Sequence, residues 1–110
     1  HSNVQNHIGT IHAAAQFALA ETQSGDYLSA LFPQYQGQFL PLLRSSSVKY
    51  RNPASSEIYA KAIAKEADLE KFEAQFLKKG RATIRVEVKV MDKENIVTMQ
   101  GEFNWFVQKV

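Results

Sequence analysis

Glu21 is the residue whose type and position most need a chemical explanation. It closes an apolar segment, Ile11 to Glu21, that is rich in alanine and leucine, the best helix formers. Apolar side chains cover nearly the whole circumference of this predicted helix, which indicates that the helix is buried. An unpaired buried carboxylate is costly. Glu21 therefore either has a functional role or faces solvent, as helix ends often do.

His12 and the backbone amide of Ala13 form a second candidate group, in the first turn of the same predicted helix. First-turn N–H groups have no intrahelical acceptor, so they can hold an oxyanion or polarise a carbonyl. Taken alone, His12 is better explained as an ordinary N-terminal or core histidine than as a ligand. At 1.5 Å per residue, Ala13 and Glu21 of one helix lie ~12 Å apart. Both can act on one carbonyl only if two copies of the helix run antiparallel in a dimer.

A metal site is a weaker interpretation of the same region. His7, His12 and Glu21 can be imagined as ligands, but the His-x-x-x-His spacing of a helical metal site is missing. The chain has no cysteine, which excludes a thiolate metal site, a disulfide scaffold and a cysteine nucleophile. We therefore expect neither a metal ion nor a cofactor.

Charge and composition exclude several classes of protein. The chain has 110 residues, of which 45% are hydrophobic and 22% charged, so it is one globular domain's worth of sequence rather than a disordered chain. Its net charge is +2, and its nearest basic cluster is Arg44, Lys49 and Arg51. That cluster is too small for a nucleic-acid footprint, although it suits an anionic small ligand. No apolar run is long enough to span a membrane.

The remaining patterns predict the elements that must position these groups. The first ten residues predict a loop, Gly25 predicts the end or a kink of the first helix, and Tyr27 to Phe32 predict another helical turn before Pro33. We expect one domain over residues 1–110, of class α+β, with a mostly antiparallel sheet around the buried helix. The other predicted elements are strands over Phe39–Tyr50, Glu57–Lys65, Ala82–Val90 and Val97–Val107, an amphipathic helix over Asp68–Lys79 capped by Gly80, and a hairpin loop over Asp92–Asn95.

The segment from Asn6 to Glu21 resembles a motif of the hotdog-fold acyl-CoA thioesterases of the phenylacetate-degradation type. That motif reads Asn-x-x-Gly-x-x-His-Gly-Gly-x-x-Phe-x-Leu-Ala-Asp, and Asn6, His12 and Glu21 stand at its spacings. Residues 48–54, Val-Lys-Tyr-Arg-Asn-Pro-Ala, look like the family's second-strand ending. The resemblance implies a hotdog fold, in which an antiparallel sheet wraps around a long buried central helix.

The resemblance also implies catalytic roles. Asn6 would orient or polarise the thioester, the amide of Ala13 would bind its oxygen, and His12 would stabilise the loop-to-helix turn. Glu21, where the family usually has Asp, would be the nucleophile or general base on a carbonyl held by the partner subunit.

Substrate-binding contacts are expected from four further residues. Gly9 and Ala14 belong to the matched motif, and Lys49 and Arg51 could meet the phosphates of coenzyme A. For the two basic residues, a solvated strand face is an equally good interpretation.

The sequence also departs from the family's pattern. Ala13 and Ala14 replace two glycines, which leaves less room for an acyl chain, and Glu21 is one methylene longer than Asp. For the polar residue that the family has on the next strand, Ser45 and Ser47 are the candidates. The family's first strand precedes the helix, and too few residues precede it here. The start at His-Ser rather than Met also suggests a processed or truncated N-terminus.

The predicted function is that of a cytoplasmic, homodimeric hydrolase of acyl-CoA, or a dimer of dimers, with no nucleic-acid or membrane partner. Two alternatives stay open. One is a hotdog dehydratase that uses His7 and Glu21, which are fourteen residues apart as in the dehydratases of the acyl-carrier-protein kind. The other is a non-catalytic module that binds acyl-CoA or a fatty acyl group.

Overall fold

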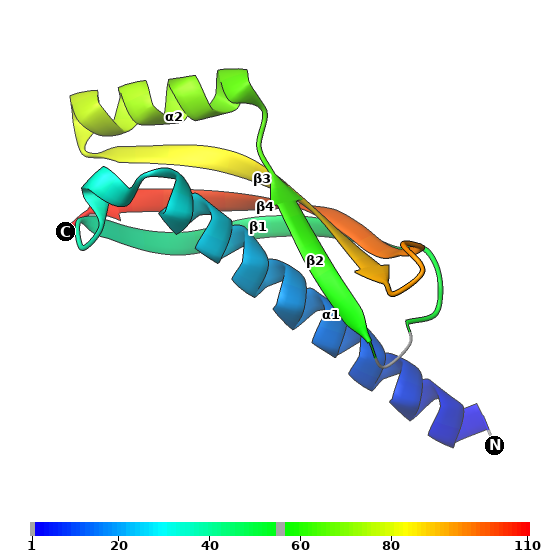
Figure 1. The fold of residues 1–110 in the computed structure, drawn as a ribbon. Helices are drawn as coiled ribbons and strands as arrows, with labels where there is room; N and C mark the ends of the chain where they lie inside the picture. Colours follow the sequence, from blue (N-terminus) through cyan, green and yellow to red (C-terminus); the bar gives the residue numbers. More distant parts are fainter. Residues whose placement is uncertain (1, 55–56) are drawn as a thin grey trace.

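Two helices pack on one face of a four-stranded antiparallel sheet (Figure 1). The computed structural model describes residues 2–54 and 57–110, with side chains from residue 13 onward. The strand order is β1-β4-β3-β2, and each neighbouring pair is antiparallel. The elements in chain order are α1 (Ser2–Leu31), the short 3₁₀ helix η1 (Pro33–Tyr35), β1 (Phe39–Tyr50), β2 (Ile58–Ile63), α2 (Glu66–Lys79), β3 (Arg81–Asp92) and β4 (Val97–Lys109).

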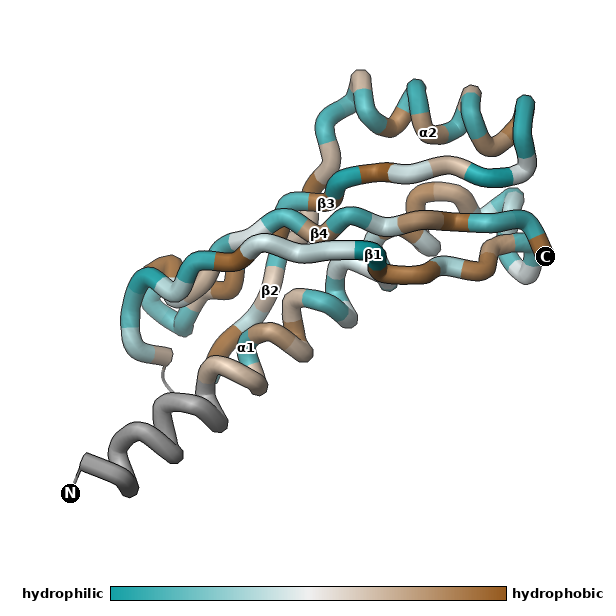
Figure 2. The backbone as a smooth tube through the Cα atoms, turned by 180° about the vertical axis from the view of Figure 1, so that it is seen from behind, coloured by the Kyte–Doolittle hydropathy of each residue, from teal (hydrophilic) through white to brown (hydrophobic). Residues whose placement is uncertain are grey.

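The sheet separates an apolar face from a polar face. Along β3 every second residue from Ala82 to Val90 is buried, and the residues between them are exposed. Figure 2 shows hydrophobic and hydrophilic residues alternating along this strand. Because strand side chains alternate between faces, the buried set faces the helices. The predicted α+β class, the four strands and the hairpin of β3 and β4 are therefore confirmed.

Helix α1 is longer than predicted at both ends. It begins at Ser2, so the loop predicted for the first ten residues is wrong, and it continues through Gly25 to Leu31. Propensity differences among ordinary residues are below about 1 kcal/mol each, so polar residues extend a helix that is already nucleated. Gly25 does not end the helix. A Cβ there would lie 3.4 Å from the ring of Trp105, so the glycine gives room to the indole.

The prediction that α1 is buried all round is wrong for the single chain. The buried residues follow one stripe at a spacing of four, and Ala14, Ala15 and Ala18 on the other side are exposed. A spacing of four keeps one helix face against the sheet. The buried stripe consists of Gln16, Ala20, Ser24 and Leu28.

Helix α2 covers the part of β3 that β2 leaves without a neighbour. Strand β2 pairs with residues 87–92 of β3, and α2 packs against the same strand (Figure 1). Glu66 and Asp68 in the first turn and Lys78 in the last complement the helix dipole. Gly80 ends the helix at φ 72°, the left-handed cap that the sequence predicts.

An aromatic cluster joins α2 to the end of α1 and the start of β1. Its ring centroids lie 4.9 to 6.4 Å apart, within the usual range for aromatic pairs. Phe72 is fully buried at its centre. The members are Phe32, Tyr35, Phe39, Phe72 and Phe76.

Candidate functional site

Glu21 is half-buried on α1, beside the stripe that packs on the sheet. Its backbone carbonyl accepts a hydrogen bond of 2.8 Å from the hydroxyl of Ser24, one turn later. The same hydroxyl accepts a hydrogen bond of 2.8 Å from Nε1 of Trp105 on β4. The helical turn that carries the candidate carboxylate is therefore fixed to a central strand by two hydrogen bonds in series.

The Ala13 end of the site differs from the prediction. Because α1 begins at Ser2, Ala13 lies in the fourth turn rather than the first. At that depth a helical N–H donates to the carbonyl four residues earlier, so the amide is not a free first-turn donor. The Ala13 carbonyl also accepts a hydrogen bond of 3.1 Å from the hydroxyl of Tyr50, which ties the end of β1 to α1.

The other residues of the Asn6–Glu21 motif also lie on α1. The backbone of Asn6, Gly9 and His12 belongs to α1, and so does that of His7, but their side chains lie outside the described residues. Ala14 is exposed on α1. The roles that the resemblance implies for these residues, and for Glu21, stay predictions.

Neither serine predicted for the polar position on β1 faces α1. Ser45 is opposite Asn104, whose side-chain amide donates a 3.0 Å hydrogen bond to it, and Ser47 is opposite the exposed face of β4 at Glu102. Ser46 is instead opposite the buried Phe103, so it shares the face on which α1 packs. A β-bulge between Leu43 and Ser45 causes the difference, because one extra residue inverts the alternation.

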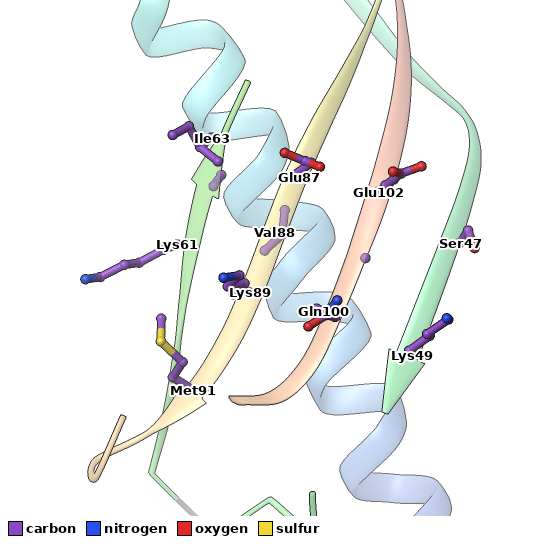
Figure 3. A pocket seen from close by; sticks show the side chains of 12 residues that line it. Ser47, Lys49, Lys61, Ile63, Glu87, Val88, Lys89, Met91, Gln100 and Glu102 are labelled. Atoms are coloured by element: carbon purple, nitrogen blue, oxygen red, sulfur yellow. The ribbon is translucent and has the colours of Figure 1, made fainter. Parts of the chain in front are cut away.

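The two basic residues of the prediction lie apart from Glu21. Lys49 is opposite Gln100 on the face of the sheet away from α1, where it lines a groove (Figure 3). Arg51 follows β1 directly, and its backbone N–H donates a 2.8 Å hydrogen bond to the Thr98 carbonyl. The sheet therefore separates Lys49 from the carboxylate of its own chain.

Gln16 is a candidate ligand-binding residue that the sequence analysis did not identify. Only 4% of it is exposed, and its Oε1 has no hydrogen-bond partner in the described part of the chain. Leaving a buried acceptor unpaired costs about 1–3 kcal/mol, so this atom is available to a donor from a bound molecule or a water. A glutamine within an apolar helix was the available signal.

Among the described residues, no three His, Asp or Glu side chains gather closely enough to hold a metal ion. None of the described helices has the length and apolar character needed to cross a bilayer.

The model of one protein family, described as a domain of unknown function (DUF4442), matches residues 1–107. The chain belongs to this family. No curated protein matches the chain. The DUF4442 model differs from the family named from the Asn6–Glu21 motif, so the closer assignment to phenylacetate-degradation thioesterases stays a prediction.

Two solved structures resemble this DUF4442 chain. One is a Pseudomonas aeruginosa protein of unknown function, described as a probable thioesterase. It is 24% identical, with a TM-score of 0.74, over 94% of this chain and 68% of that one. The other is a Chlorobaculum tepidum protein of unknown function. It is 17% identical, with a TM-score of 0.66, over 84% of this chain and 64% of that one, slightly less than two thirds of its length. With the sheet packed on a long helix, these likenesses confirm the hotdog-like α+β fold.

Proposed function

We propose that this DUF4442 chain forms the core of a thioesterase that hydrolyses acyl thioesters of coenzyme A. The observation that carries the proposal is the half-buried carboxylate of Glu21 on a turn of α1 that Ser24 and Trp105 fix to the sheet. A carboxylate carried on such a turn can activate a water as a general base or attack the thioester carbonyl itself. The probable thioesterase of P. aeruginosa, which has the same fold, supports this reaction type.

The active site is proposed to lie between two copies of the chain. Asn6, the residue that the resemblance assigns to the thioester, is fifteen residues from Glu21 on one helix. At 1.5 Å per residue that is about 22 Å, too far for both to contact one carbonyl. Two antiparallel copies of α1 would bring one chain's Asn6 toward the other's Glu21. The exposed Ala14, Ala15 and Ala18 are small enough to allow close approach of a second helix.

The proposal does not use the Ala13 amide, because that amide lies inside α1. Asn6 is therefore the assigned hydrogen-bond donor to the thioester oxygen. Ser46, on the α1-facing side of β1, replaces Ser45 and Ser47 as the candidate polar residue on the neighbouring strand.

The test is release of free thiol from a panel of acyl-CoAs of different chain length, using the full chain. Glu21→Gln keeps the size of the side chain and removes its basic form. We expect kcat to fall ~100-fold or more, as for loss of a general base. The matched control is Asp26→Asn, an exposed carboxylate on the same helix, which should leave turnover unchanged.

Two results would contradict the proposal. If Glu21→Gln turns over acyl-CoA as fast as the wild type, Glu21 is not the catalytic carboxylate. If the wild type releases no thiol from any acyl-CoA but still binds one, the protein is a non-catalytic acyl-CoA binding module. Acyl-pantetheine in the same panel separates a requirement for the coenzyme A nucleotide from a requirement for the thioester alone.

A further inference from the structure

Three lysines and a glutamine form one straight row across all four strands, on the face of the sheet away from α1. Lys61 on β2 is directly opposite Lys89 on β3, Lys89 is opposite Gln100 on β4, and Gln100 is opposite Lys49 on β1. Figure 3 shows Lys89, Gln100 and Lys49 along this face, the Lys61 side chain extending from β2 away from Lys89, and α1 behind the strands. We call this set the lysine row. It brings together residues that span positions 49 to 100 of the chain.

The lysine row carries positive charge without matching negative charge. Like charges directly opposite on paired strands destabilise a sheet, yet Lys61 and Lys89 are such a pair. In residues 13–54 and 57–110, none of the three row lysines makes an ion pair with a carboxylate. The next row holds Glu87 opposite Glu102, but Glu102 is bound at 3.5 Å by Arg85. Among the side chains that the structure describes, Glu87 is therefore the one carboxylate of that row without an ion pair, next to the three lysines.

The lysine row lies in a groove of a size that suits a small molecule. The groove has a volume of about 830 Å³, within the usual range of roughly 300–1,000 Å³ for ligand sites. Ile63 and Met91 add apolar surface to its lining, and Ser47 adds a hydroxyl. The groove thus combines cations, an amide donor and apolar walls.

We propose that the lysine row binds a small molecule that carries two or more phosphate groups. Neighbouring strands are about 4.8 Å apart, so the flexible Lys61 side chain, once turned toward Lys89, can reach the same phosphate or diphosphate. Lys49 lies two strands beyond Lys89, about 10 Å away, and meets a second anionic group, with the Gln100 amide between them. Lysine binds phosphate as a point charge from several directions. Three cations in a short row suit such a ligand and are too few for a nucleic-acid footprint.

This site is independent of the proposed thioesterase site, because the sheet separates the lysine row from Glu21. The test titrates inorganic diphosphate and triphosphate into the full chain by calorimetry at low ionic strength, with monophosphate as the comparison. We expect saturable binding that strengthens from monophosphate to triphosphate and weakens with added salt. Glu21→Gln should bind the same probes as the wild type.

The decisive variant is Lys61→Gln with Lys89→Gln. We expect it to bind diphosphate about tenfold or more weakly, since two charge-assisted contacts are lost. The free variant should be at least as stable as the wild type, because the like-charge pair is relieved. The matched control, Lys71→Gln, removes one exposed cation from α2 and should bind diphosphate normally.

Several outcomes would overturn the proposal. Binding that does not saturate, or that Lys71→Gln weakens equally, would mean nonspecific attraction to positive charge. Weaker binding by Glu21→Gln would mean that the two sites are not separate. A fall in native mass of the double variant, measured by sedimentation, with no diphosphate binding by the wild type, would make the lysine row a contact between copies of the chain.

Discussion

Trp105 on β4 donates its indole N–H to the hydroxyl of Ser24 on α1, across 2.8 Å and 81 positions of sequence. Both residues are buried, with Ser24 fully enclosed. The serine hydroxyl in turn donates a hydrogen bond to the Glu21 carbonyl, so it acts both as an acceptor and as a donor. This pair fixes the rotation and height of α1 on the sheet at the turn that holds the candidate catalytic residue.

Ser24→Ala should destabilise the protein, because it leaves the buried Trp105 N–H without an acceptor. The expected loss in free energy of unfolding is about 1–3 kcal/mol, measured by chemical denaturation. Ser29→Ala is the matched control, since Ser29 is exposed on the same helix. Alanine is the better helix former, so the control should be unchanged or slightly more stable. Equal stability of both variants would show that the Trp105–Ser24 bond contributes nothing.

Gly101→Ala should disrupt the pairing of β1 with β4. A Cβ at this position would lie 2.6 Å from Cγ1 of Val48 and 2.7 Å from the carbonyl oxygen of Ser47. The second contact is with backbone, so the strand itself must shift, at a cost of about 1–3 kcal/mol or more. Denaturation of the purified variant measures this loss.

Gly25→Ala is the comparison for Gly101→Ala. The new methyl group would meet the Trp105 ring at 3.4 Å, an ordinary close contact, and α1 would gain about 1 kcal/mol of helix propensity. We expect its stability to stay within about 1 kcal/mol of the wild type. If Gly25→Ala is the more damaging of the two, the Trp105 ring does not give way to the new methyl group, and its contact with α1 is the tighter of the two.

Local patterns were sufficient to predict the sheet and α2. The apolar residues that alternate from Ala82 to Val90 all lie on one face of a strand, so that face must be the buried one. The end of α2 is marked by Gly80, the usual residue at a left-handed helix cap. The buried face of α1 was harder to predict, because alanine favours a helix but does not indicate which side of it packs against the sheet. Its buried face is set by Ser24 and its partner Trp105, and nothing local in the sequence links residues so far apart.

The polar position on β1 shows how a single residue can invert a prediction. Counting from the inward-facing Leu43, a regular strand would point Ser45 and Ser47 toward α1. The bulge at Arg44 moves both to the other face and turns Ser46 inward. The Arg44 guanidinium lies 4.9 Å from the ring centre of Phe106 on that outer face. A bulge depends on contacts with the partner strand, and alternation alone does not reveal it.

Tyr35 gives the protein a titration at alkaline pH that can be measured directly. Burial raises the pKa of its phenol above the ordinary value of about 10. The carboxylate of Glu73 raises it further, because it accepts the phenol's hydrogen bond at 3.2 Å and repels the phenolate. The unfolded chain therefore loses this proton at lower pH than the folded protein. Stability from Tyr35 is complete below pH ~10 and is lost as the pH rises through the folded pKa.

The difference in phenolate absorbance between the wild type and Tyr35→Phe isolates the titration of Tyr35. Glu73→Gln, measured in the same way against its own Tyr35→Phe double variant, should move this curve to lower pH, because the charge that opposes the phenolate is gone. Glu70→Gln is the control, an exposed carboxylate on the same helix, and should leave the curve in place. A curve that Glu73→Gln does not move would show that Glu73 does not raise the pKa of Tyr35. The hydrogen bond from Tyr35 on η1 to Glu73 on α2 would then have no electrostatic consequence for the phenol.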